Sequence, residues 1–382
     1  MFVFREESLP KDPVFPADLK QLGYFVTEND QIKMVEHPER DFLYKISSND
    51  RINEMQKEAM NTCIREIVLS RLHDLGLEKL RLPIGAPPTS QHVPILTTPS
   101  LETQSRVIVV FGEPEQDLGI WAYRTVGREK INTGSAVDFA AFVLGKSDTK
   151  QSDSGEAAAA APGLIIANPG QLVWHCGGQR AMSLPTWRAL PRRYAVDPPM
   201  KMSFSNKIPG NYDWQNHVTY IFEEVLGKIV SPDARIDIIG LAEGGFAAVR
   251  YLAEHWPAWK PRISAICLAN PLHDFNHLHP SDFANFMSSR SRAYLISPEP
   301  LDTPVVGRDH FGCNCYSSGE ELNVECIMPK AWRSMVDWLD GMHAEKEAAE
   351  IEILREEEIQ IKDSVPGETN SENNDEDATA AA

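Results

Sequence analysis

The stretch "RIDIIGLAEGGFAAVRYLAEHW", residues 235–256, decides the fold because it joins a buried strand to a helix through a glycine-rich corner. The short, β-branched run at 235–240 is typical of a central parallel strand, and the spacing of apolar residues over 245–256 predicts a helix. Between them, the sequence "GLAEGG" supplies the small residues that a tight strand-to-helix turn requires. The arrangement of this corner therefore bears on both architecture and chemistry.

The corner has the pattern of a nucleophile elbow, in which small residues stand two positions before and after the catalytic group. Gly240, Gly244 and Gly245 fit that pattern when Ala242 occupies the nucleophile position. Shifting the register by one residue would make Glu243 the nucleophile, but would place a leucine where a small residue is needed. Ala242 has no oxygen or sulfur, so covalent acyl transfer by the usual route is not expected. An ordinary strand-to-helix turn with packing glycines is the alternative interpretation.

Apolar runs suited to buried strands alternate with helical patterns along most of the chain. This alternation predicts an α/β three-layer sandwich with a mostly parallel central sheet. An N-terminal two-stranded element and one long helix with an Asn or Asp cap are expected at 19–44 and 49–77. Further strands are expected at 106–111, 163–170, 263–270 and 292–297, and further helices at 134–145, 214–230 and 329–342.

The composition divides the chain into a body and two unusual segments. We predict an N-terminal extension (1–18), a single domain (19–343) with a disordered insertion (146–162), and an acidic charged helix and disordered tail (344–382). Of the formal net charge of −18, the tail contributes −10 and the rest of the chain −8.

Charge, hydropathy and cysteine usage exclude several classes of protein. The body has no dense Lys/Arg stripe, which argues against direct binding of duplex DNA. No apolar run is long enough to span a membrane, and the N-terminus does not resemble a secretory signal. The corner matches neither a dinucleotide fingerprint nor a phosphate-binding loop, so no cofactor is predicted. The six cysteines are sparse, as in a reduced cytosolic or nuclear protein.

A catalytic triad would also need a histidine just before the last helix and an acid after the preceding strand, here the one expected at 292–297. Asp302 and His310 are the weak candidates, but the stretch 313–330 that leads into the last helix contains no histidine. A metal site is a further alternative, although the spacing fits no familiar zinc motif, and no metal is predicted. Its conceivable ligands are His273, Asp274, His277, His279, Cys313 and Cys315.

Several motifs together resemble the Argonaute-binding-protein-two domain family, named for a subunit of the fungal Argonaute siRNA chaperone complex. The family's domain also occurs as the C-terminal part of fungal class II histone deacetylases. The resemblance covers nearly all of residues 19–343. It is carried by "LGYFVTENDQIK", "FLYKISSNDRINEMQKEAM", "VIVVFGEPEQDLGIWAYR", "TGSAVDF", "GLIIANPGQ", "GLAEGG", "LANPLHDF" and "YSSGEELNVECIMPKAWRSMVDWL".

The resemblance implies an α/β-hydrolase-like fold used in small-RNA-directed gene silencing and heterochromatin assembly. The expected protein is a non-catalytic scaffold that binds an Argonaute, a silencing-complex subunit or a histone deacetylase subunit. Its expected location is the nucleus and the cytoplasm, with the nucleus favoured. Some relatives keep a serine at the position of Ala242, so catalysis is in doubt for this chain in particular.

Binding candidates come from residue types that are frequent at interface hot spots, namely Trp121, Trp174, Trp187 and Arg188. These aromatic residues could equally belong to a lid-like segment that covers the core. Two other functions stay open: an esterase-type hydrolase that uses Ser135 or a water activated by His273, and a pseudo-hydrolase that binds a small ligand.

Overall fold

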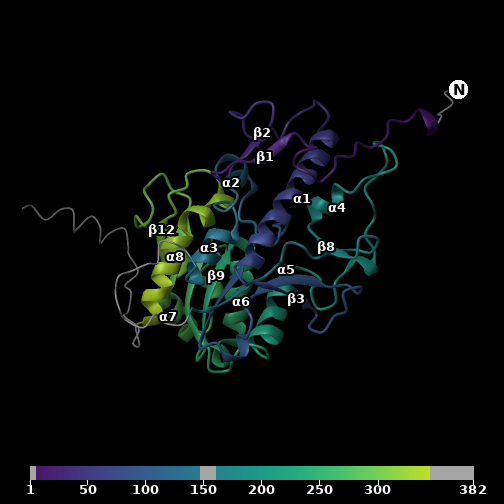
Figure 1. Ribbon diagram of the computed structural model, residues 1–382. Helices are drawn as coiled ribbons and strands as arrows, with labels where there is room; N and C mark the ends of the chain where they lie inside the picture. The colour runs from purple at the N-terminus through teal and green to yellow at the C-terminus, as the bar shows by residue number, and fades with distance from the viewer. Residues whose placement is uncertain (1–5, 147–160, 345–382) are drawn as a thin grey trace, which may run out of the picture.

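The computed structural model describes residues 6–146 and 161–344, which are built around one eight-stranded sheet (Figure 1). The strand order is β3-β4-β6-β5-β9-β10-β11-β12. Every pair from β6 to β12 is parallel, and β4 alone runs antiparallel to both of its neighbours. The strands are β3 (Glu78–Leu82), β4 (Val93–Thr97), β5 (Arg106–Phe111), β6 (Gly163–Ile166), β9 (Arg235–Leu241), β10 (Ile263–Ala269), β11 (Ser291–Leu295) and β12 (Asn314–Ser317).

The central strands are buried on both faces, which is why they have nearly continuous apolar sequences. In β5, Ile108 and Val110 pack into one core cluster, whereas Val107 and Val109 pack into the other. The first cluster includes residues of α1, α3 and α8, and the second includes residues of α5, α6 and α7. The sheet is therefore the middle layer of three, and the predicted α/β-hydrolase-like sandwich with a mostly parallel sheet is confirmed.

The helices cover the two faces of this sheet (Figure 1). Asn49 caps the longest of them, since its side chain accepts a hydrogen bond from the backbone N–H of Arg51. The helices are α1 (Asp50–Asp74), α2 (Tyr123–Arg128), α3 (Ala136–Val143), α4 (Leu184–Arg188), α5 (Trp214–Tyr220) with a π-helical turn (Ile221–Leu226), α6 (Ala242–Trp259), α7 (Ser281–Arg290) and α8 (Ile327–Ala344).

Two small antiparallel sheets complete the architecture: β1 (Tyr24–Val26) with β2 (Ile32–Met34), and β7 (Val173–His175) with β8 (Arg180–Met182). The predicted N-terminal two-stranded element and capped long helix are thus confirmed. The sequence patterns did not reveal β3, β4, α7 or β12. The edge strand β3 has the charged sequence "EKLRL", and β12 has only four residues, so neither presents an apolar run.

The end of α8 is held against the N-terminal edge of the sheet. The guanidinium of Arg106, at the start of β5, contacts Asp237 at 2.6 Å and Asp340 of α8 at 2.7 Å. In addition, Arg290 donates to the backbone carbonyl of Met342 at 2.6 Å. The core of the predicted insertion (147–160) and the tail from residue 345 lie outside the described residues.

Candidate functional site

The corner between β9 and α6 is a sharp turn centred on Ala242. Ala242 has a φ of 40°, in the left-handed region that non-glycine residues seldom adopt, and it is only 5% exposed. A Cβ atom added to Gly240 would lie 2.4 Å from the Cα of Gly245, and one added to Gly244 would lie 2.1 Å from the carbonyl oxygen of Gly112. The glycines are therefore required by close backbone approach. The turn has the geometry of a nucleophile elbow and presents a methyl group.

The loop that follows β5 is a second part of hydrolase machinery, because its backbone N–H contributes to an oxyanion hole in such folds. Here the N–H of Glu113 donates to Oε1 of Gln116 at 3.2 Å. Nε2 of Gln116 in turn donates to the backbone carbonyl of Trp121 at 2.7 Å. A side chain of the protein thus occupies the donor that a reacting carbonyl oxygen would need.

The acid and base positions of a triad are engaged elsewhere. After β11, the carboxylate of Asp302 accepts hydrogen bonds from the hydroxyls of Tyr294 (3.0 Å) and Ser334 (2.7 Å). After β12, where the chain order of such hydrolases places the histidine, the loop contains Glu320. Burial acts to raise the pKa of Glu320, but its hydrogen bond with Lys330 and those from two backbone N–H groups lower that pKa to about 2.

The candidate histidines do not join these positions. His310 is exposed with its ring against that of Phe311, and its ring is not hydrogen-bonded to Asp302. His273 is buried, and its Nε2 donates to the carbonyl of Phe311 at 2.8 Å. Burial lowers the pKa of His273 to about 4, which keeps the ring neutral. Ser135, the other candidate nucleophile, is 1% exposed and donates to the carbonyl of Asn132.

The histidine-rich loop has local structural roles. His277 accepts the backbone N–H of Asp274 at the start of a short 3-10 helix, and His279 precedes a cis proline. Cys313 and Cys315 are buried. Within the described ranges, 6–146 and 161–344, no three His, Cys, Asp or Glu side chains are grouped closely enough to hold a metal ion.

The three candidate tryptophans are buried, so they are not themselves exposed anchors. Trp174 packs near His92, and Trp187 donates its indole N–H to the carbonyl of Met200 at 2.9 Å. Trp174 thus packs the segment 172–207 against the body, whereas the contact of Trp187 lies within that segment. Of the four predicted binding residues only Arg188 is exposed at the surface.

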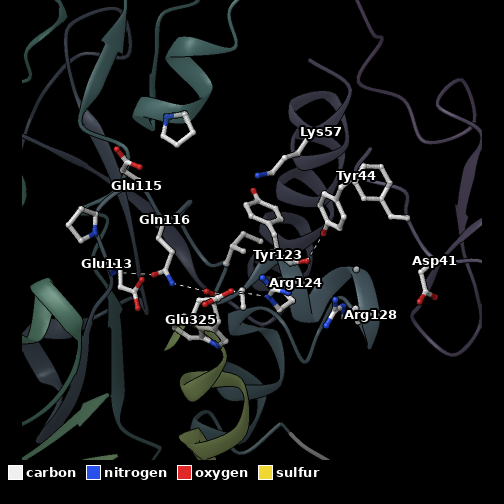
Figure 2. A pocket seen from close by; sticks show the side chains of 17 residues that line it. Asp41, Tyr44, Lys57, Glu113, Glu115, Gln116, Tyr123, Arg124, Arg128 and Glu325 are labelled. Carbon is white, nitrogen blue, oxygen red and sulfur yellow. Dashed lines mark hydrogen bonds and ion pairs between the residues drawn. The ribbon is translucent and has the colours of Figure 1, made fainter. Parts of the chain in front are cut away.

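A cavity of about 750 Å³ opens beside the corner, at the carboxyl ends of the strands (Figure 2). Its walls come from α1, α2, the loop after β5 and the turn that precedes α8. The sequence analysis missed it, although "FGEPEQ" directly after the buried β5 was a usable signal. The lining residues are Asp41, Phe42, Tyr44, Lys57, Glu113, Pro114, Glu115, Gln116, Ile120, Trp121, Ala122, Tyr123, Arg124, Gly127, Arg128, Pro185 and Glu325.

Buried ionic contacts fix the wall of the cavity. The carboxylate of Asp117 receives hydrogen bonds from Arg65 of α1 (2.8 Å), Tyr123 of α2 (2.6 Å) and Gln171 (2.7 Å). Because three separate segments meet at one buried carboxylate, this contact holds α1 and α2 against the loop that follows β5. Tyr44 extends the wall by donating its hydroxyl to the backbone carbonyl of Tyr123 at 3.0 Å.

Glu113 has an unusual electrostatic environment within the cavity. Burial, followed by the charges of Glu243 and Glu325, raises the pKa of Glu113 to about 7. Glu325 forms an ion pair with Arg124 at 3.0 Å. Among the described residues, the carboxylate of Glu113 has no hydrogen bond and no ion pair.

Known structures with similar folds include two histone deacetylases and an esterase. A histone deacetylase from Saccharomyces cerevisiae is 14% identical, with a TM-score of 0.41, and the match covers 74% of this chain and 97% of that chain. The histone deacetylase Clr3 is 12% identical, with a TM-score of 0.41, over 80% of this chain and 41% of that chain. One of two esterases from Rhizomucor miehei is 11% identical, with a TM-score of 0.33, over 75% and 90% of the two chains.

Identities and TM-scores as low as these do not indicate a shared activity. No curated protein matches the sequence. None of the helices in the described part of the chain is long and apolar enough to cross a membrane. In contrast, the Arb2 domain matches residues 15–301, and these residues make up three quarters of the chain. This protein belongs to the Arb2 domain family.

Proposed function

We propose that this protein is a non-catalytic binding component of small-RNA-directed gene silencing and heterochromatin assembly, working mainly in the nucleus. Its partner is an Argonaute, a silencing-complex subunit or a histone deacetylase subunit. Membership of the Arb2 domain family supports the silencing context. The observation that carries the non-catalytic part is the left-handed turn at Ala242, which keeps the shape of an elbow without a nucleophile.

Three further contacts support this reading of the site. The N–H of Glu113 is bound by Gln116, and the carboxylate of Asp302 is bound by two hydroxyls. Glu320 stands in the loop after β12 and is ion-paired with Lys330 at 2.8 Å. An acyl-transfer site needs a nucleophile, a base and a free oxyanion donor in one place. In this protein the nucleophile position carries a methyl group, and the carboxylate of Asp302 and the N–H of Glu113 are already hydrogen-bonded.

Affinity purification of the tagged full chain from cells that express it, followed by mass spectrometry, tests the partner. We expect an Argonaute or a subunit of a silencing or deacetylase complex to be enriched over an untagged control. Recovery of no Argonaute and no silencing factor under mild salt conditions would overturn the proposal. Arg188→Ala is an informative variant, because Arg188 is the exposed member of the predicted binding residues.

Esterase assays with short acyl esters test the non-catalytic part. We expect no turnover by the wild type, and none by Ala242→Ser, because restoring the hydroxyl supplies neither a base nor a free oxyanion donor. The variant should melt within a few degrees of the wild type, which makes the negative result meaningful. Turnover by the wild type that disappears in His273→Ala would instead establish the alternative hydrolase.

A pseudo-hydrolase that binds a ligand is the second candidate function. The cavity of about 750 Å³ beside the corner favours it, since its volume is in the range of small-molecule sites. A ligand site and a protein-binding role are compatible, because a partner can insert one side chain into the cavity.

A further inference from the structure

The cavity beside the corner contains a carboxylate without a partner. Glu113 lies two residues after the end of β5, and it is half-buried. Two further carboxylates, of Glu243 on α6 and Glu325 before α8, lie near enough to act on its charge. Arg124 on α2 is bound to Glu325, and no cation among the described residues is bound to Glu113. Buried carboxylates are ordinarily paired or hydrogen-bonded.

A second group in the same cavity is also unsatisfied. Trp121 lines the cavity and is 2% exposed, and its indole N–H has no acceptor among the described residues. A buried donor left without an acceptor costs about 1–3 kcal/mol. Because this nitrogen has less than 1 Å² of accessible surface, it stays within the wall, and the carboxylate of Glu113 is the unpaired group that the cavity presents to a ligand.

The charges in the cavity are unevenly arranged. Figure 2 shows Glu113 and Glu115 on one side, while Arg128 and Asp41 lie on the opposite side and Lys57 projects from α1. The hydroxyl of Tyr123 donates to Asp117 and that of Tyr44 to a backbone carbonyl, so these hydroxyls are engaged within the wall. The acidic side is thus where charge compensation is missing.

We propose that this cavity binds an ammonium or guanidinium group on a slender apolar stem, with Glu113 as its counter-ion. Two sources share this chemistry: a basic side chain of a partner protein, which brings peptide carbonyls with it, and a free small cation. The inference goes beyond the proposed silencing role and does not depend on the identity of the partner.

Isothermal titration of the full-length protein at pH 8.5 tests the proposal with four probes. These are the blocked amino acids Nα-acetyl-arginine methylamide, Nα-acetyl-norleucine methylamide and Nα-acetyl-glutamate methylamide, and butylguanidinium, which lacks carbonyls. We expect the arginine probe to bind at one site and the norleucine and glutamate probes not to bind. Tighter binding of the arginine probe than of butylguanidinium indicates a protein side chain as the source, and the reverse order indicates a free small cation.

Glu113→Gln and Glu115→Gln form a matched pair of variants. Both lie in the same loop, but Glu115 is exposed and Glu113 is half-buried. We expect Glu113→Gln to weaken binding of the arginine probe at least ~10-fold and Glu115→Gln to change it less than ~2-fold. Thermal melting of both variants checks that they fold. Equal losses in the two variants, or no binding by the wild type, would overturn the proposal.

The pH dependence is a separate readout. A cation requires the ionised form of Glu113, whose pKa lies at about 7. The charges of Glu243 and Glu325 act on Glu113, and the other charged residues that line the cavity are Asp41, Lys57, Glu115, Arg124 and Arg128, so none of these groups is a histidine. We therefore expect the affinity of the arginine probe to rise more than ~10-fold between pH 5.5 and 8.5 in the wild type and to stay flat in Glu113→Gln. An affinity that falls with increasing pH contradicts the assignment. The outcome is independent of which proteins co-purify with the chain.

Discussion

The corner at Ala242 and the cavity beside it contrast sharply in how their polar groups are satisfied. At the corner and its neighbouring triad positions, Gln116, Tyr294, Ser334 and Lys330 bind the groups that stand where a hydrolase has its oxyanion donor, acid and base. In the cavity, Glu113 and Trp121 have no such partners. Natural proteins seldom leave buried polar groups unpaired unless a function requires them. This difference is the reason why we propose the cavity, and not the corner, as a binding site.

The largest expected loss of stability comes from a substitution in the corner itself. Gly244→Ala places a Cβ atom 2.1 Å from the carbonyl oxygen of Gly112, a contact that rigid backbone cannot relieve. We expect a loss of more than ~4 kcal/mol in the free energy of unfolding, or failure to fold, measured by chemical denaturation. Gly341→Ala is the control, because a Cβ there meets nothing within 4 Å. Equal behaviour of the two variants would show that the corner tolerates a wider turn.

The wall of the cavity should respond nearly as strongly. Asp117→Ala leaves Arg65 without its most buried partner and removes the acceptor for Tyr123 and Gln171. We expect a loss of about 3 kcal/mol in the free energy of unfolding. Lys260→Ala, which removes an exposed ion pair with Asp282, should cost less than ~1 kcal/mol. A small effect of Asp117→Ala would mean that α1 and α2 are held by apolar packing alone.

Glu113→Gln should stabilise the fold while it removes cation binding. The pKa of Glu113 is raised from its ordinary 4.5 to about 7, so the folded state binds this proton more tightly than the unfolded state. Its favourable contribution is complete below pH 4.5 and is lost as the pH rises through 7. Relative to the wild type, we expect Glu113→Gln to be more stable by about 1 kcal/mol at pH 8, with no difference attributable to ionisation at pH 4.5.

Denaturant titrations at the two pH values measure this effect. A variant that is less stable than the wild type at pH 8 would show that the Glu113 carboxylate contributes to folding, and the contrast between corner and cavity would disappear. A gain in stability together with a loss of binding is typical of functional sites.

The smallest expected effect concerns strain at the corner. Ala242→Gly relieves the positive φ of 40° but makes the unfolded chain more flexible. These terms oppose each other, so we expect a change between zero and about +1 kcal/mol in the free energy of unfolding. A loss greater than ~1 kcal/mol would show that the buried methyl group packs well and that strain is minor. Differential scanning calorimetry resolves changes of this size.

The sequence predicted the elements whose apolar pattern is strong and continuous. The strand–corner–helix at 235–256 and the capped helix that starts after Asn49 follow from local rules, and both were found. The antiparallel pair of β3 and β4 was not found, because β3 has the charged sequence "EKLRL" and β4 contains a proline, so neither has the pattern of a typical strand. The burial of Trp174 and Trp187 was also out of reach, since residue type alone does not tell a lid from an interface.

The cavity could be predicted only in part, for a physical reason. The acidic residue after β5 is visible in the sequence, but its isolation from every cation is a property of the folded arrangement. In contrast, the sequence alone shows that position 242 has no serine and that residues 313–330 contain no histidine. The lack of a catalytic serine and histidine was thus easier to predict than the cation site that we propose.

The anchoring of α8 has a practical consequence for how the molecule is oriented. Arg106 begins β5 and holds Asp340 near the end of α8, whereas Glu113 follows the other end of the same strand. Six residues of extended strand span roughly 20 Å, so residue 344 leaves the domain on the side opposite the cavity. A surface or fusion partner attached through the C-terminus would leave the cavity facing outward. Immobilisation through the C-terminal end is therefore preferred for measuring ligand binding. Immobilisation through the N-terminal segment, where Asp12 pairs with Arg51, is less suitable.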